Sequence, residues 1–418
     1  MITIRRIAIF VSICLCSNCD SVDDHIDTSD LNEKVEIFKQ FQIDKNPVFI
    51  VEGSSDSCYA VDKSGHLIDY WNFEYKTGND VQLDKDGNLL GIFKPNETPE
   101  ISFGGFGGII QHFDASSPLI WEYQLNNSEE ILHHDVELLP NGNILALVWE
   151  RININEAVSM GVDTDVDIYT EKIIEINPNN NKIVWEWKSI NHIIQNNDTT
   201  KPNFGNPISD PSRIDINFVD SNSKDGDIMH ANGLDYCEER DIIFLSVNFY
   251  NEIWVIDHST SIDESHSSFG GDFRNGGDLI YRFGNPSAYG ESGRQLFDRV
   301  HFPNLIEDNI PGKGNVLTYS NGISNKQSSV LEIQLPLKLE LRPGRVKEPR
   351  VVWEYTNDSI FSKILCGAVR LKNGNTLITE ADYGLWEITP NKEVVWKYKA
   401  YSDENILQKK NIWRAYKY

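Results

Sequence analysis

A short pattern of apolar and aromatic positions recurs six times along this chain of 418 residues. In outline, two apolar or β-branched residues precede an aromatic residue, one further residue and a second aromatic residue. Such alternation over a few residues is typical of a β-strand with one buried face. The six copies are LIDYWNF at 67–73, LIWEY at 119–123, IVWEW at 183–187, LIYRF at 279–283, VVWEY at 351–355 and VVWKY at 394–398.

Two further strand signals accompany most copies. One is a turn with Gly or Asn followed by an apolar strand, as in LDKDGNLL, LLPNGNIL, LDYCEERDIIFL, IPGKGNVL and LKNGNTL. The other is an alternating strand that a polar turn joins to the aromatic strand, as in IIEINPNNNKIVWEW. Several short strands per unit, repeated about six times, are typical of a β-propeller, whose blades bury their faces against one another. We therefore predict an all-β fold, a six-bladed β-propeller over residues 45–418; a pair of β-sandwiches does not explain six similar units.

Three segments depart from the repeat. Residues 189–224, rich in Asn, Asp, Pro and Ser, fill the longest gap between copies and predict a loop insertion. Residues 258–276 predict a second insertion, and we expect both to shape a substrate pocket. Residues 30–41 precede the first blade and favour a short helix. His192, within the first insertion, is expected at a surface or turn position.

The N-terminus predicts export. Arg5 and Arg6 precede an apolar run at 7–15, which is too short to span a bilayer and is typical of a signal peptide. Three cysteines, Cys14, Cys16 and Cys19, crowd the end of this run, and the pattern resembles a bacterial lipoprotein signal in which one cysteine is acylated after cleavage. We predict a signal peptide at 1–19 with Cys19 as the lipidated residue, then a tether and short helix at 20–44. The protein is then periplasmic, or a lipoprotein of the outer membrane or cell surface that touches the membrane only through its anchor; simple secretion is the alternative.

Charge and composition narrow the range of partners. The formal net charge of -25 disfavours nucleic acid and anionic lipid surfaces, because the field of the protein repels phosphate. An anionic small substrate therefore needs a local cluster of donors. The cysteines after the signal region, Cys58, Cys237 and Cys366, are odd in number and widely spaced, so neither a disulfide framework nor a thiolate zinc site is predicted.

Histidines lie at similar distances ahead of the Gly-turn strands of three successive units. His134, preceded by His133, is in LHHDVELLPNGNIL, His230 is in IMHANGLDY and His301 is in LFDRVHFPNLI. Equivalent positions of successive blades converge near the central channel of a propeller, so these side chains are expected around one pocket. A lone histidine is more often a satisfied core or turn residue. Three at matching positions favour either metal binding, by zinc or copper, or nucleophilic and acid–base chemistry.

Residues 107–398 resemble the bacterial arylsulfate sulfotransferases. The resemblance rests on HHDVELLPNGNIL, DIMHANGLDY with NEIWVIDHST, GGDLIYRFGNPSAYG with LFDRVHFPNLI, and GAVRLKNGNTLI, in this order. It implies a six-bladed propeller, in agreement with the repeat. It also implies transfer of a sulfuryl group from a phenolic sulfate ester to a phenolic acceptor, without a cofactor or a nucleotide sulfate donor, through a covalent sulfohistidine.

The resemblance assigns roles to individual residues. His301 takes the place of the nucleophile, although LFDRVH is one residue longer than the family pattern and has Val300 in place of Gln. His134 and His230 take the places of the two supporting histidines. Asn248 stands where the family has an arginine that binds sulfate, and it can donate one amide hydrogen bond but no charge. Either another cation compensates, Arg282 or Arg370, or the sulfate donor differs, or the activity is weak.

Two other classes of function remain open from the sequence. One is a non-catalytic propeller that binds a small ligand or an envelope partner after loss of the arginine. The other is a metal-dependent propeller enzyme that uses the same three histidines. Asn321 is assigned no role, since Asn321 and Gly322 are explained by a hairpin turn. The oligomeric state is left open.

Overall fold

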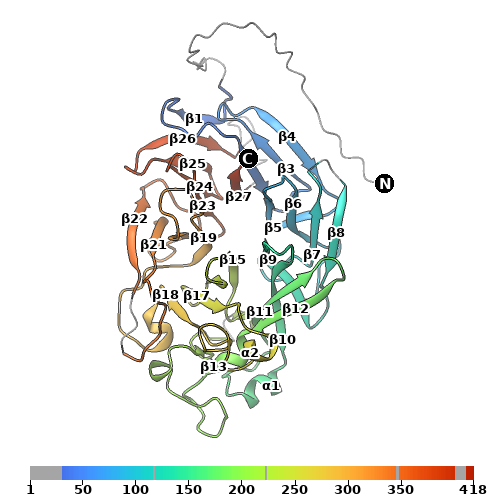
Figure 1. The fold of residues 1–418 in the computed structure, drawn as a ribbon, viewed down its shortest axis with the longest axis vertical. Helices are drawn as coiled ribbons and strands as arrows, with labels where there is room; N and C mark the ends of the chain where they lie inside the picture. The colour runs from blue at the N-terminus through green and yellow to red at the C-terminus, as the bar shows by residue number, and fades with distance from the viewer. Residues whose placement is uncertain (1–30, 116–117, 222–223, 345–347, 401–410) are drawn as a thin grey trace, which may run out of the picture.

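The computed structural model describes residues 31–115, 118–221, 224–344, 348–400 and 411–418 (Figure 1). The predicted signal peptide, the predicted lipidation site Cys19 and most of the predicted tether lie outside the described residues. Within the described ranges, the helices are too short and too polar to cross a membrane.

Six antiparallel sheets stand around a central axis, which confirms the six-bladed β-propeller (Figure 1). The strands of a blade are named from the innermost outward. Blade 1 contains β27 (Ile412–Lys417), β2 (Val48–Glu52), β3 (Ser57–Val61) and β4 (Leu67–Asn72). Blade 2 contains β5 (Lys76–Leu83), β6 (Leu89–Lys94), β7 (Ile109–Phe113) and β8 (Leu119–Gln124). Blade 3 contains β9 (Glu130–Leu138), β10 (Ile144–Ile152), β11 (Ile168–Asn177) and β12 (Lys182–Lys188).

The second half of the ring repeats this order. Blade 4 contains β15 (Ala231–Cys237), β16 (Ile242–Val247), β17 (Glu252–Asp257) and β18 (Tyr281–Phe283). Blade 5 contains β19 (Val300–Leu305), β20 (Val316–Ser320), β21 (Ser329–Gln334) and β22 (Arg350–Thr356). Blade 6 contains β23 (Gly367–Arg370), β24 (Thr376–Glu380), β25 (Gly384–Ile388), β26 (Val394–Lys399) and β1 (Val35–Phe38). The six aromatic repeats thus form the outermost strands β4, β8, β12, β18 and β22 and the outer strand β26.

Tryptophans of the outer strands tie each blade to the next. In four blades the indole Nε1–H donates to the turn between the two outer strands of the following blade, which satisfies a half-buried donor that would otherwise be costly to shield from water. The pairs are Trp121 to Asn181 Oδ1 (2.7 Å), Trp185 to Thr260 Oγ1 (3.0 Å), Trp353 to the Pro390 carbonyl (3.0 Å) and Trp396 to the Lys63 carbonyl (2.8 Å). The aromatic repeat in the sequence therefore reflects a contact between neighbouring blades that recurs around the ring.

The helix predicted over residues 30–41 is wrong where the structure describes it. Val35–Phe38 is strand β1, which pairs antiparallel with β26, with Phe38 opposite Trp396. The open edge of blade 6 offers backbone partners to this segment, and such tertiary pairing overrides local helix preference. The propeller therefore begins with β1 rather than at residue 45.

The two predicted insertions lie in loops of blades 3 and 4, as expected. The described residues of the insertion at 189–224 include the short elements η2 (Ser189–His192), β13 (Ile193–Ile194), η3 (Pro207–Ser209) and β14 (Ile214–Asp215). The second insertion begins with α2 (Ile262–Ser265), while α1 (Ile154–Ser159) and η5 (Pro286–Tyr289) lie in other connections.

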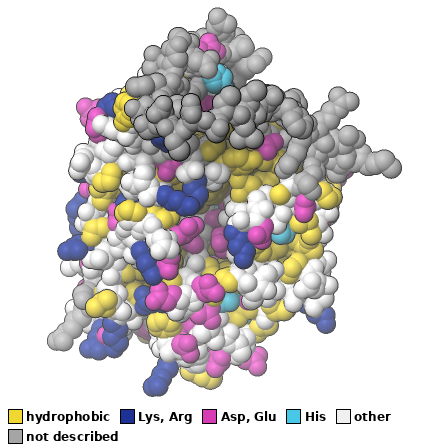
Figure 2. Space-filling view, turned by 45° about the horizontal axis from the view of Figure 1, so that its top comes forward, with side chains coloured by type: hydrophobic (Ala, Val, Ile, Leu, Met, Phe, Trp, Pro, Cys, Tyr) yellow, Lys and Arg dark blue, Asp and Glu magenta, His cyan; other side chains and the backbone are white. Residues whose placement is uncertain are grey.

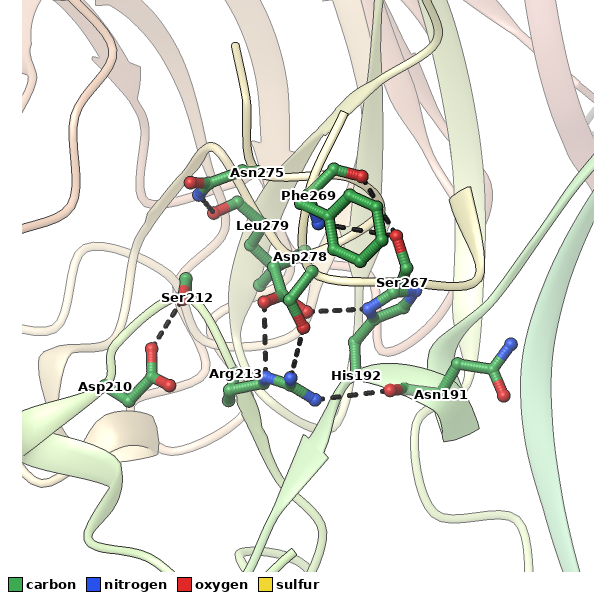
Figure 3. Close-up of polar contacts among 12 residues, drawn as sticks. Asn191, His192, Asp210, Ser212, Arg213, Ser267, Phe269, Asn275, Asp278 and Leu279 are labelled. Atoms are coloured by element: carbon green, nitrogen blue, oxygen red, sulfur yellow. Dashed lines mark hydrogen bonds and ion pairs between the residues drawn. The ribbon is translucent and has the colours of Figure 1, made fainter. Parts of the chain in front are cut away.

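His192 joins the two insertions and is fully buried, so its expected surface position is wrong. Its Nδ1 lies 2.7 Å from Asp278 Oδ1 (Figure 3). Its Nε2 lies 2.8 Å from the Ser265 carbonyl oxygen. Arg213 Nε lies 3.2 Å from the other Asp278 oxygen, and Trp187 stacks on the imidazole. These contacts fix the insertion of residues 189–224 against blade 4 (Figure 3).

A cavity of about 790 Å³ opens where the innermost strands run into their Gly-turns. Its lining includes the carboxyl groups of Asp80, Asp135, Glu137 and Asp235. Figure 2 shows acidic side chains around a hollow near the middle of the face that it displays. Burial raises the pKa of Asp135 and Glu137 well above their usual range and that of Asp235 to about 7, so these carboxyls hold protons that water-exposed carboxyls lose.

We expect Asp235→Asn to stabilise the protein at pH 8 more than at pH 5. Because the folded-state pKa of Asp235 is about 7 and the unfolded value is about 3.9, stability is lost as pH rises through about 7. Because Asn carries no charge, the variant avoids this loss, and its free energy of unfolding relative to wild type should be on the order of 1 kcal/mol more favourable at pH 8 than at pH 5. Thermal unfolding at both pH values measures the difference. The control is Asp86→Asn at an exposed position; equal effects of Asp235→Asn at the two pH values would contradict the prediction.

Candidate active site

The three predicted histidines lie at one end of the central channel. His134 is on β9, His230 immediately precedes β15 and His301 is on β19, so they come from blades 3, 4 and 5. At each of these strands one residue has a left-handed backbone conformation, with φ of 53° at His134, 54° at His230 and 53° at Phe302. The register of pairing with the neighbouring strand shifts at the same place. Such bulges redirect side chains, here toward a common centre. The ring centroids of His134 and His230 are 5.0 Å apart, and His301 is close enough to His134 to influence its titration.

The tautomer of His301 follows from its neighbour Asn321. Asn321 Nδ2 donates to the Ser362 carbonyl oxygen at 2.8 Å, which fixes the amide so that Oδ1 faces the imidazole. His301 Nδ1 lies 2.6 Å from this oxygen and must carry the hydrogen. Nε2 of His301 therefore keeps its lone pair. Asn321, assigned only to a turn from the sequence, orients the candidate nucleophile.

Burial keeps the imidazoles of His133, His134 and His301 neutral. It lowers the pKa of His301 to about 3, an effect to which the charge of Arg414 adds. It also lowers the pKa of His133 and His134 well below their usual range. A neutral imidazole is the nucleophilic form, so His301 is competent to attack at ordinary pH without first losing a proton.

A chain of buried groups leads from Glu171 to His134. Glu171 Oε2 lies 3.0 Å from His133 Nε2, and His133 Nδ1 lies 2.9 Å from His134 Nδ1. Burial raises the pKa of Glu171 to about 8, so at neutral pH the carboxyl holds its proton. Of the two facing Nδ1 atoms, one donates to the other, and His134 Nε2 lies on the far side of its ring. A Cβ at Gly105 would stand 2.0 Å from that nitrogen, so only glycine leaves room for it.

His230 is paired with a carboxylate. Its Nδ1 lies 2.5 Å from Asp227 Oδ2, and its ring stacks on Phe249 with centroids 4.9 Å apart and 16° between the planes. The side chain of Asp227 is buried while that of His230 is 18% exposed, which makes His230 the more accessible partner. A histidine held by a carboxylate through Nδ1 offers Nε2 for proton transfer.

Arg282 and Arg370 do not reach this cluster, so their expected role is wrong. The Arg282 guanidinium is buried on β18 at the outside of blade 4, where it donates to Glu252 Oε1 at 2.9 Å. Arg370 donates to Glu332 Oε2 at 2.7 Å and lines the acidic cavity. Both charges are already neutralised by carboxylates.

Two other arginines supply positive charge at the histidines. Arg299 Nη1 donates to Asn248 Oδ1 at 3.2 Å, so the charge missing from position 248 is present on its partner. Arg414, buried on β27, donates to the Cys366 carbonyl oxygen at 2.8 Å, and its charge acts on both His134 and His301. Neither guanidinium forms an ion pair with a carboxylate of the described residues. Unpaired buried cations beside neutral imidazoles suit an anionic group.

The arrangement does not suit a metal ion. Within the described ranges, no three His, Cys, Asp or Glu side chains converge in a way that could hold one. The metal-dependent hypothesis therefore finds no support in the geometry.

Sequence reasoning missed four contributors besides Asn321: Glu171, Gly105, Arg299 and Arg414. The sequence did contain a signal for Arg299, which lies two residues before His301 in LFDRVH. It contained no such signal for Arg414, because this residue lies on β27, beyond the last aromatic repeat. Its place in the channel depends on ring closure.

Solved structures with a similar arrangement include the propeller domain of Cps50 (Swd1) from Myceliophteria thermophila, at 9% identity and a TM-score of 0.41, covering 88% of this chain and 86% of that chain. BamB from Moraxella catarrhalis is similar at 9% identity and a TM-score of 0.36, covering 87% and 91%. At TM-scores below 0.5 these likenesses carry no weight. No curated protein sequence matches the chain.

The family comparison is informative. The model for "Arylsulfotransferase (ASST)" matches residues 34–266, which is more than half of the chain. The matched segment includes His134, His230 and Asn248, while His301 and Arg414 lie beyond it. The chain belongs to the arylsulfotransferase (ASST) family.

Proposed function

We propose that the protein moves a sulfuryl group from a phenolic sulfate ester to a phenolic acceptor through a covalent intermediate on His301. One observation carries the proposal: the neutral imidazole of His301 has its Nδ1 hydrogen committed to Asn321 and an Nε2 lone pair, and the charge of Arg414 acts on the same ring. Family membership supports the same reaction class.

In the first step, Nε2 of His301 attacks sulfur and the bond between sulfur and the phenolic oxygen breaks. The leaving oxygen takes the electron pair and is protonated by His230. In the second step, the acceptor phenol gives its proton to Nε2 of His230 while its oxygen attacks sulfur, and the nitrogen–sulfur bond breaks. His230 thus regains the proton that it lost, so the cycle balances.

The sulfuryl oxygens need fixed positive charge as the phenolate leaves. Arg299 and Arg414 are suited to this role, and His134 adds a neutral imidazole to the cluster. Asn248 contributes indirectly, because its Oδ1 accepts from Arg299 and its Nδ2 faces the Val300 carbonyl oxygen. It is therefore a positioning residue for the cation from the next blade.

The place of action belongs to the same proposal. The signal peptide and Cys19 predicted from the sequence support an exported, lipid-anchored enzyme of the periplasm or cell surface. Labelling with a radioactive fatty acid, compared between the full chain and Cys19→Ala, tests the anchor.

Replacing His301 is expected to abolish transfer. With 4-nitrophenyl sulfate as donor and phenol as acceptor, His301→Ala should lose at least about a thousandfold in kcat because the covalent step is gone. Mass spectrometry of the protein mixed with donor alone should find one added SO₃ group on His301. His66→Ala, at a half-exposed histidine outside the cluster, is the control. Turnover retained in His301→Ala, or an adduct elsewhere, contradicts the assignment; a folded wild-type protein without turnover favours the ligand-binding alternative.

Loss of the Arg299 charge is expected to lower the rate of transfer. Arg299→Gln should reduce kcat by about a hundredfold or more, since one donor fewer then faces the developing charge. Arg299→Lys should restore part of the rate, and Asn248→Ala should lower it less than Arg299→Gln. Arg350→Gln, at an exposed position on β22, serves as the matched control. An unchanged kcat in Arg299→Gln would show that Arg414 alone supplies the charge.

A further inference from the structure

Phe249 forms an aromatic face at the edge of the histidine cluster. It follows β16, is half-buried, and carries the His230 imidazole stacked on its ring at 4.9 Å. Two cations also lie against this ring: Lys224 Nζ is 4.3 Å and Arg299 Cζ is 4.8 Å from its centroid. An aromatic ligand beside His230 would therefore meet one ring and two positive charges.

The two cations are held together without a carboxylate to neutralise them. Neither Lys224 nor Arg299 forms an ion pair within the described part of the chain. The nearest acid acting on Lys224 is Asp227, whose Oδ2 is bound to His230. Burial lowers the pKa of Lys224, and repulsion by Arg299 lowers it further. The protein as a whole has a net charge of -25, whereas two cations without ion pairs lie side by side at this site. An anionic ligand would offset the repulsion between them.

Arg299 and Lys224 have different positions relative to the reacting group. Arg299 is hydrogen-bonded to Asn248, which also contacts the backbone of Val300 beside His301, so its charge belongs to the sulfuryl position. Lys224 comes from the end of the insertion at 189–224, and its ammonium group lies over the Phe249 ring. Its charge is therefore left for a second group on the same ligand.

We propose that the aromatic substrates of this site carry a second anionic substituent, a carboxylate or a sulfate group, which pairs with Lys224 beside Phe249. The inference rests on the proposed function for the orientation of the ligand. The insertion at 189–224 then takes part in selecting the substrate. The substrates expected are phenols or phenolic sulfates with a second anionic group, rather than simple phenols.

Binding rather than turnover gives the direct test. Calorimetry compares 4-hydroxybenzoate and 4-hydroxybenzenesulfonate with 4-hydroxybenzamide, which has a similar shape and no charge. The wild-type protein should bind at least one of the anions about fivefold more tightly than the amide, as expected for one partly exposed ion pair. The preference should shrink at high salt. Preference for the carboxylate or for the sulfonate distinguishes the two anionic groups.

Variants locate the effect. Lys224→Gln should bring the three dissociation constants within about twofold of each other, because it removes the charge and keeps a polar chain of similar length. Lys201→Gln lies in the same insertion, at a lysine already near Asp198, and should keep the wild-type preference. Equal binding of acids and amide by the wild type, no binding of any of the three, or a preference that survives in Lys224→Gln overturns the proposal.

The test is separable from that of the proposed function. Transfer from 4-nitrophenyl sulfate to uncharged phenol reports on the reaction alone. If this transfer occurs and the anion preference is absent, the reaction stands and the substrate class is wrong. If the preference depends on Lys224 and no transfer occurs, the binding site stands and the reaction is wrong.

Discussion

The antiparallel pairing of β27 with β2 joins the end of the chain to its beginning, and the candidate active site depends on it. Val51 lies opposite Arg414 in this ladder, so closure of blade 1 carries the guanidinium into the channel. The imidazoles of His134 and His301 come from blades 3 and 5, on strands that lie far from β27 in the sequence. The charge that faces them exists only in the closed ring.

The fold was predictable because one contact is repeated. The tryptophans of β8, β12, β22 and β26 make the same donation to the next blade, and the same aromatic pattern therefore returns at each outer strand. The strand β1 was not predictable in this way. Its partner β26 lies some 360 positions away, and nothing local in VEIF distinguishes an added edge strand from a helical turn.

The site was predictable where its residues share a position on the innermost strands. His134, His230 and His301 were found by that equivalence. The positions of the cations could not be predicted in this way, because a positive charge can reach the same point from any strand. Arg299 is hydrogen-bonded to residue 248, where a positive charge was expected, and Arg414 brings a second charge to His301. The role of Asn321 was missed because a hairpin turn already explained an asparagine at this position. In the structure its Nδ2 donates to the Ser362 carbonyl oxygen, and its Oδ1 fixes the tautomer of His301.

The acidic cavity carries less negative charge than its composition suggests. Asp80, Asp135, Glu137 and Asp235 line it. Burial raises the pKa of Asp135 and Glu137 well above their usual range and that of Asp235 to about 7. The formal net charge of -25 counts all of these groups as ionised. The field that an anion meets in the channel is therefore weaker than the formal charge implies, and it grows as the pH of the medium rises.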